Sequence, residues 1–319
     1  MPAKNQSQSP LDNDDDGDCK NLVHVIEELL ERRRKEVRDG KVYFHVWSHD
    51  DWHREWKSSE LRDTVYSSYS ALRKGKLKRP PPPSTVMEIA DYLECSLEER
   101  NRLLVAAHYA PIPPYLTGDK LIPVAKIAKE ITDYIPLPSY IINRDWNILS
   151  LNRHLLKFVG LTENDASRIS ANRLNILHLI LDPVLPIYQG LAHSSDSWEY
   201  IARRNIYGFK LENSISQYDD WFKPHIEELM KLPRFAEFWE EIQIDWLTSS
   251  DAEFPYYTTE MMSPIGKLVR FRSILTSIGN YDYPQIVSYI PVDQESRDIF
   301  TELGIPTPQH AWGTMLPSD

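Results

Sequence analysis

Two histidines four residues apart are the first feature with recognisable chemistry in this chain of 319 residues. His49 and His53, in the stretch His49-Asp-Asp-Trp-His53, would share one face of a helix, as the two histidines of the zinc motif H-E-x-x-H do. Aspartate replaces the motif's glutamate and is one methylene shorter, and no third ligand follows at a recognisable spacing. We therefore expect both histidines to face solvent, and the sequence predicts no metal site.

Other catalytic patterns are missing from the sequence. No two glycines lie within two positions of each other, so phosphate loops of the G-x-G type are absent, and so is the G-x-S-x-G turn of α/β-hydrolases. The two cysteines, Cys19 and Cys95, are too few for a disulfide framework or a four-thiolate zinc site. We expect Cys95 to be a small buried residue, no catalytic residues, no required cofactor and no enzymatic activity.

A dense basic run stands out because the chain as a whole is acidic, with a formal net charge of −11. Five of the seven residues from 73 to 79 are basic and none is acidic. Such a run suits contacts with a phosphate backbone, and a solvated lysine-rich loop is the alternative. The five aspartates among residues 1–19 instead predict a disordered acidic tail.

The elements that must position this run form an all-α domain over residues 20–116. Apolar residues at helical spacing, Gly40 and Gly75 as helix ends and the capping box Ser96-Leu-Glu-Glu99 predict five helices. They begin at Leu22, near Ser48, near Glu60, after Ser84 and after Ser96; the third runs to Lys74 and carries the start of the basic run.

The rest of the chain changes character after a connecting helix over residues 117–136. Ser139 to Leu151 predicts two strands around a polar turn at Asn143 to Asp145. Mostly helical sequence follows, and then three strands and a last helix from Asp293 to Leu303. This order predicts an α+β domain over residues 137–305, with helices inserted into an antiparallel sheet, and a flexible tail over 306–319.

Hydropathy completes these expectations. Mean hydropathy is −0.47, no apolar run approaches 18 residues, and the N-terminus lacks the features of a secretory signal. We therefore expect a soluble, cytoplasmic protein without a membrane partner.

The helical domain resembles Xre-type helix-turn-helix modules. The stretch Tyr66-Ser-Ser-Tyr-Ser-Ala-Leu-Arg-Lys-Gly75 is similar to that family's recognition helix, which typically ends in S-R-L-E-x-G. Glu88-Ile-Ala-Asp-Tyr-Leu93 and Leu97-Glu-Glu-Arg-Asn-Arg-Leu-Leu104 are also family-like. Together they resemble the variant of the module found in MmyB-like transcription regulators.

The C-terminal part resembles the PAS-like ligand-binding domain of the same regulators. Pro138 to Asn152 is similar to its opening, and Asn175-Ile-Leu-His-Leu-Ile-Leu-Asp-Pro183 to its next signature. Phe235-x-x-Phe-Trp239, Pro264-Ile-Gly-Lys-Leu268 and Tyr289-Ile-Pro-Val-Asp-x-x-Ser296 continue in the same order. Each motif is short, and their collinear order over about 230 residues carries the resemblance.

The resemblance implies a regulator that binds double-stranded DNA, as a homodimer on palindromic sites. The implied recognition helix presents some side chains to bases and others to phosphates, while Tyr69 is expected in the core. The implied DNA-binding residues are Tyr66, Ser67, Ser68, Ser70, Arg73, Lys74, Lys76, Lys78 and Arg79.

The resemblance also implies a cavity between a five-stranded sheet and its inserted helices, for a small apolar, fatty-acyl-like effector. Asn152 either contacts the ligand or caps the next helix, and the arginines either anchor a carboxylate or stay solvated. The aromatic residues line the cavity or pack in the core. The implied ligand-binding residues are Tyr140, Trp146, Asn152, His178, Trp198, Arg203, Trp221, Phe222, Phe238 and Arg270.

Two other functions stay open. The unusual second helix, Asp50-Asp-Trp-His-Arg-Glu-Trp56, and the acidic balance favour a sensor or protein-interaction protein whose helix-turn-helix no longer binds DNA. An enzyme that uses the PAS-like cavity is a third possibility.

Overall fold

The computed structural model describes residues 18–40, 54–77, 79–113, 115–242 and 258–307. The chain divides into two compact units. We call Met1–Pro114 together with Ile215–Pro224 the helical unit, and Tyr115–Ser214 together with His225–Asp319 the sheet unit. The helical unit therefore takes up a short segment from the second half of the chain.

The described part of the helical unit contains helices from five stretches of sequence. Leu22, Ile26 and Leu29 are fully buried at the spacing of one helix face, and they join the apolar side chains of the other helices in one core. Cys95 is buried in the same core, where burial raises the pKa of its thiol to about 12. The helices are α1 (Asp18–Arg38), α2 (Ser58–Thr64), α3 (Tyr69–Arg73), α4 (Pro83–Tyr92) and α5 (Leu97–Ala106).

The structure corrects the predicted recognition helix. The sequence predicts one helix over residues 60–74, but the structure breaks it at residues 65–68. Val65 is β-branched, and Ser67 and Ser68 offer the backbone alternative hydrogen bonds, so this stretch favours a helix only weakly.

The helix predicted near Ser48 falls largely outside the described residues. Its last part, residues 54–57, is described and is not helical. Trp56 has a positive φ of 54°, which a helix interior does not allow, and its side chain is buried against Tyr92. The prediction is therefore wrong for these four residues.

The start of α5 confirms the predicted capping box. The Ser96 hydroxyl accepts a hydrogen bond from the amide of Glu99 (3.3 Å), and the Glu99 carboxylate accepts one from the amide of Ser96 (3.0 Å). The same carboxylate forms a buried ion pair with Arg33 of α1, whose guanidinium also donates to the carbonyl of Leu93 (2.8 Å). Pairing and hydrogen bonding offset the cost of burying both charges, so α1 and α5 are held in one arrangement.

The sheet unit is built on five antiparallel strands in the order β2-β1-β5-β4-β3. The two edge strands, β2 and β3, are consecutive in the chain. The helices are inserted between them, as the sequence predicts. The α+β arrangement of a helical region followed by this sheet is confirmed. The strands are β1 (Ser139–Ile142), β2 (Ile148–Leu151), β3 (Thr259–Met262), β4 (Leu268–Ile278) and β5 (Tyr281–Pro291).

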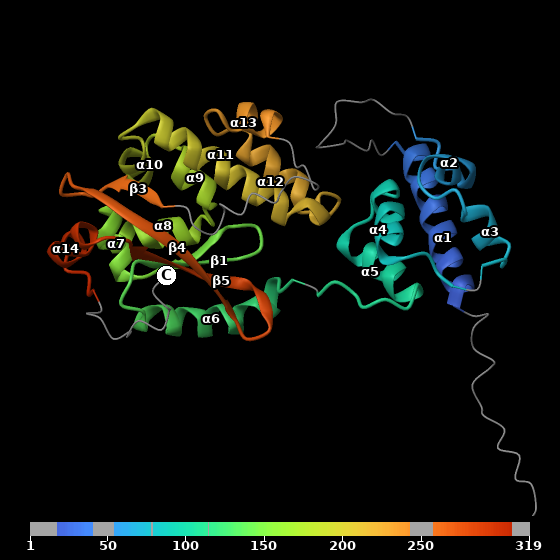
Figure 1. Cartoon of the computed structure of the whole chain (residues 1–319), viewed down its shortest axis with the longest axis horizontal. Helices are drawn as coiled ribbons and strands as arrows, with labels where there is room; N and C mark the ends of the chain where they lie inside the picture. The colour runs from blue at the N-terminus through green and yellow to red at the C-terminus, as the bar shows by residue number, and fades with distance from the viewer. Residues whose placement is uncertain (1–17, 41–53, 78, 114, 243–257, 308–319) are drawn as a thin grey trace, which may run out of the picture. The chain divides into compact units, whose positions relative to one another are not determined.

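Helices cover both faces of this sheet (Figure 1). On one face α6 (Gly118–Tyr134) packs against β1 and β5, where Ala128 is buried against Ile141 and Ile286. On the other face lie helices of the insertion, and α14 (Gln294–Glu302) follows β5. The inserted helices are α7 (Arg153–Val159), α8 (Glu163–Ala171), α9 (Ile176–Leu181), α10 (Pro186–Leu191), α11 (Ser195–Glu212), the 3₁₀ turn η1 (Ser214–Ser216), α12 (Phe222–Leu229) and α13 (Phe235–Glu241).

Candidate functional site

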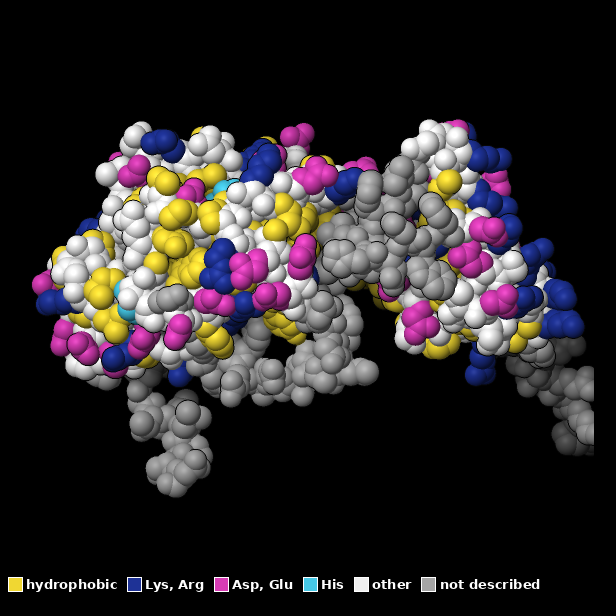
Figure 2. All heavy atoms as spheres, turned by 90° about the horizontal axis from the view of Figure 1, so that it is seen from above, with side chains coloured by type: hydrophobic (Ala, Val, Ile, Leu, Met, Phe, Trp, Pro, Cys, Tyr) yellow, Lys and Arg dark blue, Asp and Glu magenta, His cyan; other side chains and the backbone are white. Residues whose placement is uncertain are grey.

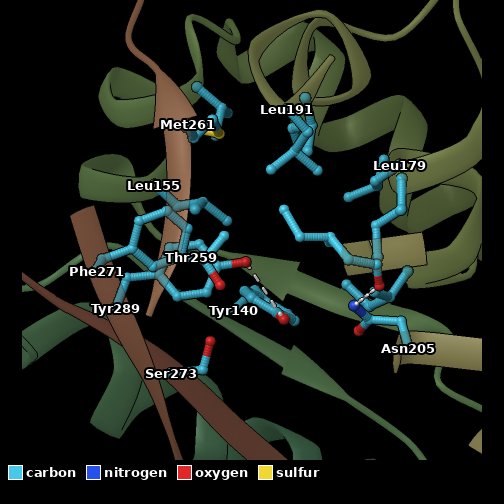
Figure 3. A pocket seen from close by; sticks show the side chains of 15 residues that line it. Tyr140, Leu155, Leu179, Leu191, Asn205, Thr259, Met261, Phe271, Ser273 and Tyr289 are labelled. Atoms are coloured by element: carbon cyan, nitrogen blue, oxygen red, sulfur yellow. Dashed lines mark hydrogen bonds between the residues drawn. The ribbon is translucent and has the colours of Figure 1, made fainter. Parts of the chain in front are cut away.

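A cavity of about 80 Å³ lies between the sheet and the inserted helices of the sheet unit (Figure 3). Fifteen side chains line it, and most of them are apolar. They come from four strands and four helices that are far apart in the sequence. The lining residues are Tyr140, Leu155, Val159, Ile176, Leu179, Ile180, Ile187, Leu191, Ile201, Asn205, Thr259, Met261, Phe271, Ser273 and Tyr289.

Strand alternation explains which sheet residues reach the cavity. Thr259 and Met261 are two apart on β3, and Phe271 and Ser273 are two apart on β4, so each pair points to the same face. The register places Thr259 opposite Phe271 and Ser273 opposite Tyr289 on the neighbouring strand. The cavity floor is thus one continuous face of the sheet.

Helices α7, α9, α10 and α11 form the opposite side of the cavity. Leu155 of α7, Leu179 of α9, Leu191 of α10 and Ile201 of α11 are all nearly fully buried. The α7 helix starts where the sheet ends, because Asn152 follows β2 and accepts a hydrogen bond from the amide of Leu155 (2.9 Å). Local capping therefore aims the first helix of the insertion at the cavity.

Two tyrosines provide the main polar contact inside the cavity. The Tyr289 hydroxyl donates to the Tyr140 hydroxyl over 3.5 Å, and the two rings meet edge to face at 5.7 Å. Burial raises the pKa of both phenols above the ordinary value, so both hydroxyls stay protonated at neutral pH. Asn205 adds an amide, whose nitrogen donates to the carbonyl of Ile201 (2.8 Å). The cavity can therefore hydrogen-bond a ligand through neutral groups.

Of the ten ligand-binding residues predicted from the resemblance, Tyr140 is the one in the lining of this cavity. The structure places the two predicted arginines in ion pairs elsewhere. Arg203 pairs with Glu199 (2.9 Å) and Glu241 (2.6 Å). Arg270 lies on the opposite face of β4, where it pairs with Glu260 (2.9 Å).

Three further predicted residues brace the sheet unit. Trp146 donates to the Glu212 carboxylate (2.9 Å) and packs on Phe209. Asn152 caps α7, which was the alternative to ligand contact, and also donates to the carbonyl of Leu137 (2.8 Å). The ring of His178 accepts the amide of Asn175 (3.3 Å) at the start of α9.

The remaining predicted aromatic residues are packed in two places. Trp198 donates to the carbonyl of Ile180 (2.8 Å), and its ring lies 6.1 Å from that of Phe238. The ring centroids of Trp221 and Phe222 lie 5.5 Å apart. Both residues belong to the segment of the helical unit that comes from the second half of the chain. Trp198 also borders a second, more open hollow of about 330 Å³.

Residues that sequence reasoning missed include Thr259, Ser273 and Tyr289. The sequence gives only a partial signal for them, since polar and apolar residues alternate from Val269 to Arg272 on β4 but not along β3. Alternation identifies the two faces of a strand, but it does not say which face a distant helix covers. Thr259 and Ser273 are small polar residues outside any motif, and Tyr289 belongs to the motif Tyr289-Ile-Pro-Val-Asp-x-x-Ser296, which supports the family resemblance without implying a ligand contact.

The predicted DNA-binding residues lie around α3 of the helical unit. Ser67 and Ser68 are exposed, Tyr66 and Ser70 are half-buried, and Tyr69 is buried, as expected. Of the basic residues, Arg73, Lys74, Lys76 and Arg79 are exposed, while Lys78 lies outside the described residues. In Figure 2, Lys and Arg side chains gather along one edge of the helical unit, with Asp and Glu among them.

The end of α3 explains how the basic residues are displayed. Gly75 has a φ of +65°, the amide of Gly75 donates to the carbonyl of Leu72 (2.9 Å), and the amide of Lys76 donates to that of Ala71 (2.9 Å). This left-handed C-terminal motif turns the chain sharply, as predicted for Gly75. Arg73 also lies 3.7 Å from the Glu27 carboxylate of α1, which neutralises part of the local charge.

The described ranges contain neither a candidate metal site nor a candidate membrane-spanning helix. No group of His, Cys, Asp or Glu side chains there could hold a metal ion. None of the helices described is both long and apolar enough to traverse a lipid bilayer. His49 and His53 lie outside the described residues.

Comparison with known families adds a finding that is independent of this geometry. Residues 128–300 match the model of the MmyB-like transcription regulator ligand binding domain. This stretch is more than half of the chain and contains all five strands and every residue of the cavity lining. No curated protein sequence matches the chain significantly.

Proposed function

The chain belongs to the family of MmyB-like transcription regulators, and we propose that it is a regulator whose sheet unit binds a small apolar molecule and thereby changes how the helical unit binds duplex DNA. The observation that carries the ligand half of this proposal is the mainly apolar cavity between sheet and helices. Few, well-placed polar groups in an apolar lining are typical of small-molecule sites. A fatty-acyl-like compound is the first class of ligand to test.

The ligand half is tested on protein as purified. Native mass spectrometry should detect one bound small molecule per chain, and the mass should return to that of the bare chain after denaturation. Repeated preparations that carry no added mass, and that show no thermal shift with acyl compounds, would contradict it.

The basic residues at the end of α3 support the DNA half of the proposal. Arg73, Lys74 and Lys76 project from the end of a short helix, next to the exposed hydroxyls of Ser67 and Ser68. Side chains of this kind contact phosphates, and hydroxyls contact base edges with little discrimination. We propose that this face of the helical unit is the nucleic-acid interface and that two copies bind a palindromic site.

A salt titration tests the DNA half. We expect binding to genomic duplex fragments that weakens steeply as salt rises, because cation release accompanies each phosphate contact. The double variant Lys74→Glu and Lys76→Glu should lose at least 10-fold in affinity at 100 mM salt. The matched control, Lys120→Glu with Lys126→Glu on α6, makes the same change in charge in the sheet unit and should bind normally.

A protein-interaction role is the second candidate, and specific observations favour it. The α3 helix has only five residues, and Arg73 is engaged by Glu27. Such a helix offers few side chains to a major groove. No binding to DNA at any salt concentration would favour this second role, whereas full binding by the Lys74→Glu, Lys76→Glu variant would contradict the placement of the interface at the end of α3.

A further inference from the structure

An acidic stretch, residues 12–18, comes directly before the core of α1 and carries as many charges as the basic run, residues 73–79, at the end of α3. Five of the seven residues in the acidic stretch are aspartates and none is basic, whereas five of the seven in the basic run are basic and none is acidic. We propose that the acidic stretch binds the basic run of the same chain and competes there with the phosphates of DNA. This inference rests on the proposed nucleic-acid interface and adds an autoinhibitory contact to it.

The start of α1 brings the acidic stretch to this face of the helical unit. Residues 12–17 lie outside the described ranges, but Cys19 in the first turn of α1 is buried in the core against which Tyr66 also packs. Burial and the electrostatic interaction with Cys19 both raise the pKa of the Tyr66 phenol, so the two side chains are neighbours. Tyr66 lies just before α3, and the chain therefore enters α1 beside the proposed interface.

Further along, α1 remains beside α3. The Tyr69 hydroxyl donates to the Glu27 carboxylate of α1 (2.8 Å), and the Arg73 guanidinium lies 3.7 Å from the same carboxylate. Cys19 and Glu27 are separated by about 12 Å of helix, at a rise of about 1.5 Å per residue. The first turns of α1 therefore lie along the stretch from Tyr66 to Arg73, and the acidic stretch joins this face at the end nearer to Tyr66.

The length of the acidic stretch is sufficient for the contact. An extended chain advances about 3.3 Å per residue, so Asp16 can lie up to about 10 Å from Cys19 and Asp12 up to about 23 Å. The α3 helix has five residues and is about 7.5 Å long. Gly17, between the aspartates and α1, lacks a Cβ and permits a sharp turn of the chain. The aspartates can therefore reach the basic run within one molecule.

The basic run has cations available for this contact. Within the described ranges no carboxylate forms an ion pair with Lys74, Lys76 or Arg79, and all three side chains are exposed, whereas Arg73 is near Glu27. A single exposed ion pair is weak, but several pairs held together by a short tether act at an effective concentration in the millimolar range. The contact is strong enough to occupy the run and weak enough for DNA to displace.

The competition should depend on salt. Aspartate carboxylates and DNA phosphates contact the same cations, so DNA has to displace the acidic stretch before it binds. Salt screens the internal contact as well as the contact with DNA, because both are between exposed charges. The inhibition is therefore largest at low salt, and the affinity of wild type for DNA should fall less steeply with salt than that of a variant without the aspartates.

Carbodiimide cross-linking of the full chain at low salt tests the contact without DNA. The reagent joins a carboxylate to an amine that touches it, and trypsin then releases residues 5–20 as one peptide for mass spectrometry. We expect this peptide to be joined to the basic run and not to the exposed Lys120 or Lys126 of the sheet unit. In a mixture of isotopically light and heavy chains, the cross-links should stay within one chain. No cross-link to the basic run, or cross-links mainly between chains, would overturn the inference.

Neutralising the aspartates tests the competition itself. With Asp12, Asp14, Asp15 and Asp16 all replaced by asparagine, the full chain should bind non-specific duplex DNA about 5-fold more tightly than wild type at about 50 mM salt, and about equally at about 300 mM. Replacing the same four residues by glutamate retains the charge and should leave the affinity unchanged. A control for net charge neutralises four exposed carboxylates of the sheet unit and should change the affinity by less than about 2-fold. Its substitutions are Asp119→Asn, Glu130→Gln, Glu227→Gln and Asp282→Asn.

The outcomes distinguish this inference from the proposed function. Equal DNA binding by wild type and the asparagine variant at low salt would refute the competition and leave the proposed interface standing. An equal gain in affinity in the sheet-unit control would also refute it, because net charge would then account for the effect. If neither wild type nor the asparagine variant binds DNA, the proposed DNA binding is contradicted, and the cross-linking result alone supports or refutes the contact.

Discussion

Two buried asparagines hold backbone in place, and one of them, Asn152, is among the ligand contacts that the family resemblance implies. Asn152 is 2% exposed and accepts hydrogen bonds from the amides of Ser139 and Leu155 while donating to the carbonyl of Leu137. Asn175 likewise caps α9 and donates to the carbonyl of Asp145 (2.5 Å). A buried amide with every group satisfied joins two elements and has little capacity left for a ligand.

His225, which contacts Asn175, makes the stability of the fold depend on pH. Its ring nitrogen lies 3.1 Å from the side-chain nitrogen of Asn175, and burial together with nearby His178 lowers its pKa to about 4. An unfolded histidine binds a proton below about pH 6.5, so between pH 6.5 and 4 the unfolded state binds more protons than the folded state. The contribution of His225 therefore lowers the free energy of unfolding as the pH falls through this window.

Urea unfolding at pH 7 and pH 5 measures the effect. From pH 7 to pH 5, the free energy of unfolding should fall by about 1–2 kcal/mol more in wild type than in His225→Gln. His193→Gln, at an exposed histidine, is the control and should behave as wild type. Equal losses in wild type and His225→Gln would show that His225 does not titrate in this way.

At the scale of elements, the cavity depends on how closely α10 approaches β3. Gly190 of α10 faces the strand, and a Cβ there would lie 2.8 Å from the carbonyl oxygen of Met262 and 3.0 Å from the side chain of Met261. Only glycine permits this approach without displacing backbone. The contact fixes the position of Leu191, the next residue, in the cavity wall.

The Gly190→Ala variant tests this packing. Although alanine favours helix, the clash should separate α10 from β3 and lower the free energy of unfolding by about 1–3 kcal/mol. The affinity for acyl compounds should change as well, because Met261 and Leu191 both line the cavity. Gln189→Ala, on the exposed side of the same helix, should be close to neutral. If Gly190→Ala is as stable as wild type, the close approach is not essential.

At the scale of the whole molecule, the helical unit includes a segment that the chain contributes late. Residues 215–224 begin within η1, and the Asp219 carboxylate accepts a hydrogen bond from the amide of Leu97 (2.7 Å) at the start of α5. The guanidinium of Arg100 also lies 5.9 Å from the ring centroid of Tyr218. The chain therefore leaves the sheet unit after Ser214 and returns to it at His225.

Replacing Asp219 by alanine should release this segment. The first turn of α5 loses a charge-assisted acceptor. We therefore expect the free energy of unfolding of the helical unit to fall by about 1 kcal/mol. Amide hydrogens of residues 97–99 and of residues 215–224 should exchange faster with deuterium. Asp220→Ala, at the exposed neighbour, is the matched control, and identical exchange in the two variants would rule out this role for Asp219.

Local patterns in the sequence determined much of the fold. The capping box at Ser96, the turn between β1 and β2 and the order of two strands, helices and three strands all follow from short-range spacing, because capping and strand alternation act within a few residues. The predicted helix over residues 60–74 was wrong because its break follows from weak local propensities that the apolar spacing did not reveal.

The tertiary structure decided which side chains share the cavity. Tyr140 and Tyr289 are 149 positions apart, and only strand register brings their hydroxyls together. The same register puts Arg270 on one face and Ser273 on the other, so Ser273 lines the cavity and Arg270 does not. The sequence by itself determined the elements and the family resemblance, because those depend on local spacing and motif order. Sheet pairing and helix packing decided the chemistry of the cavity, because contacts between distant residues have no short-range signature.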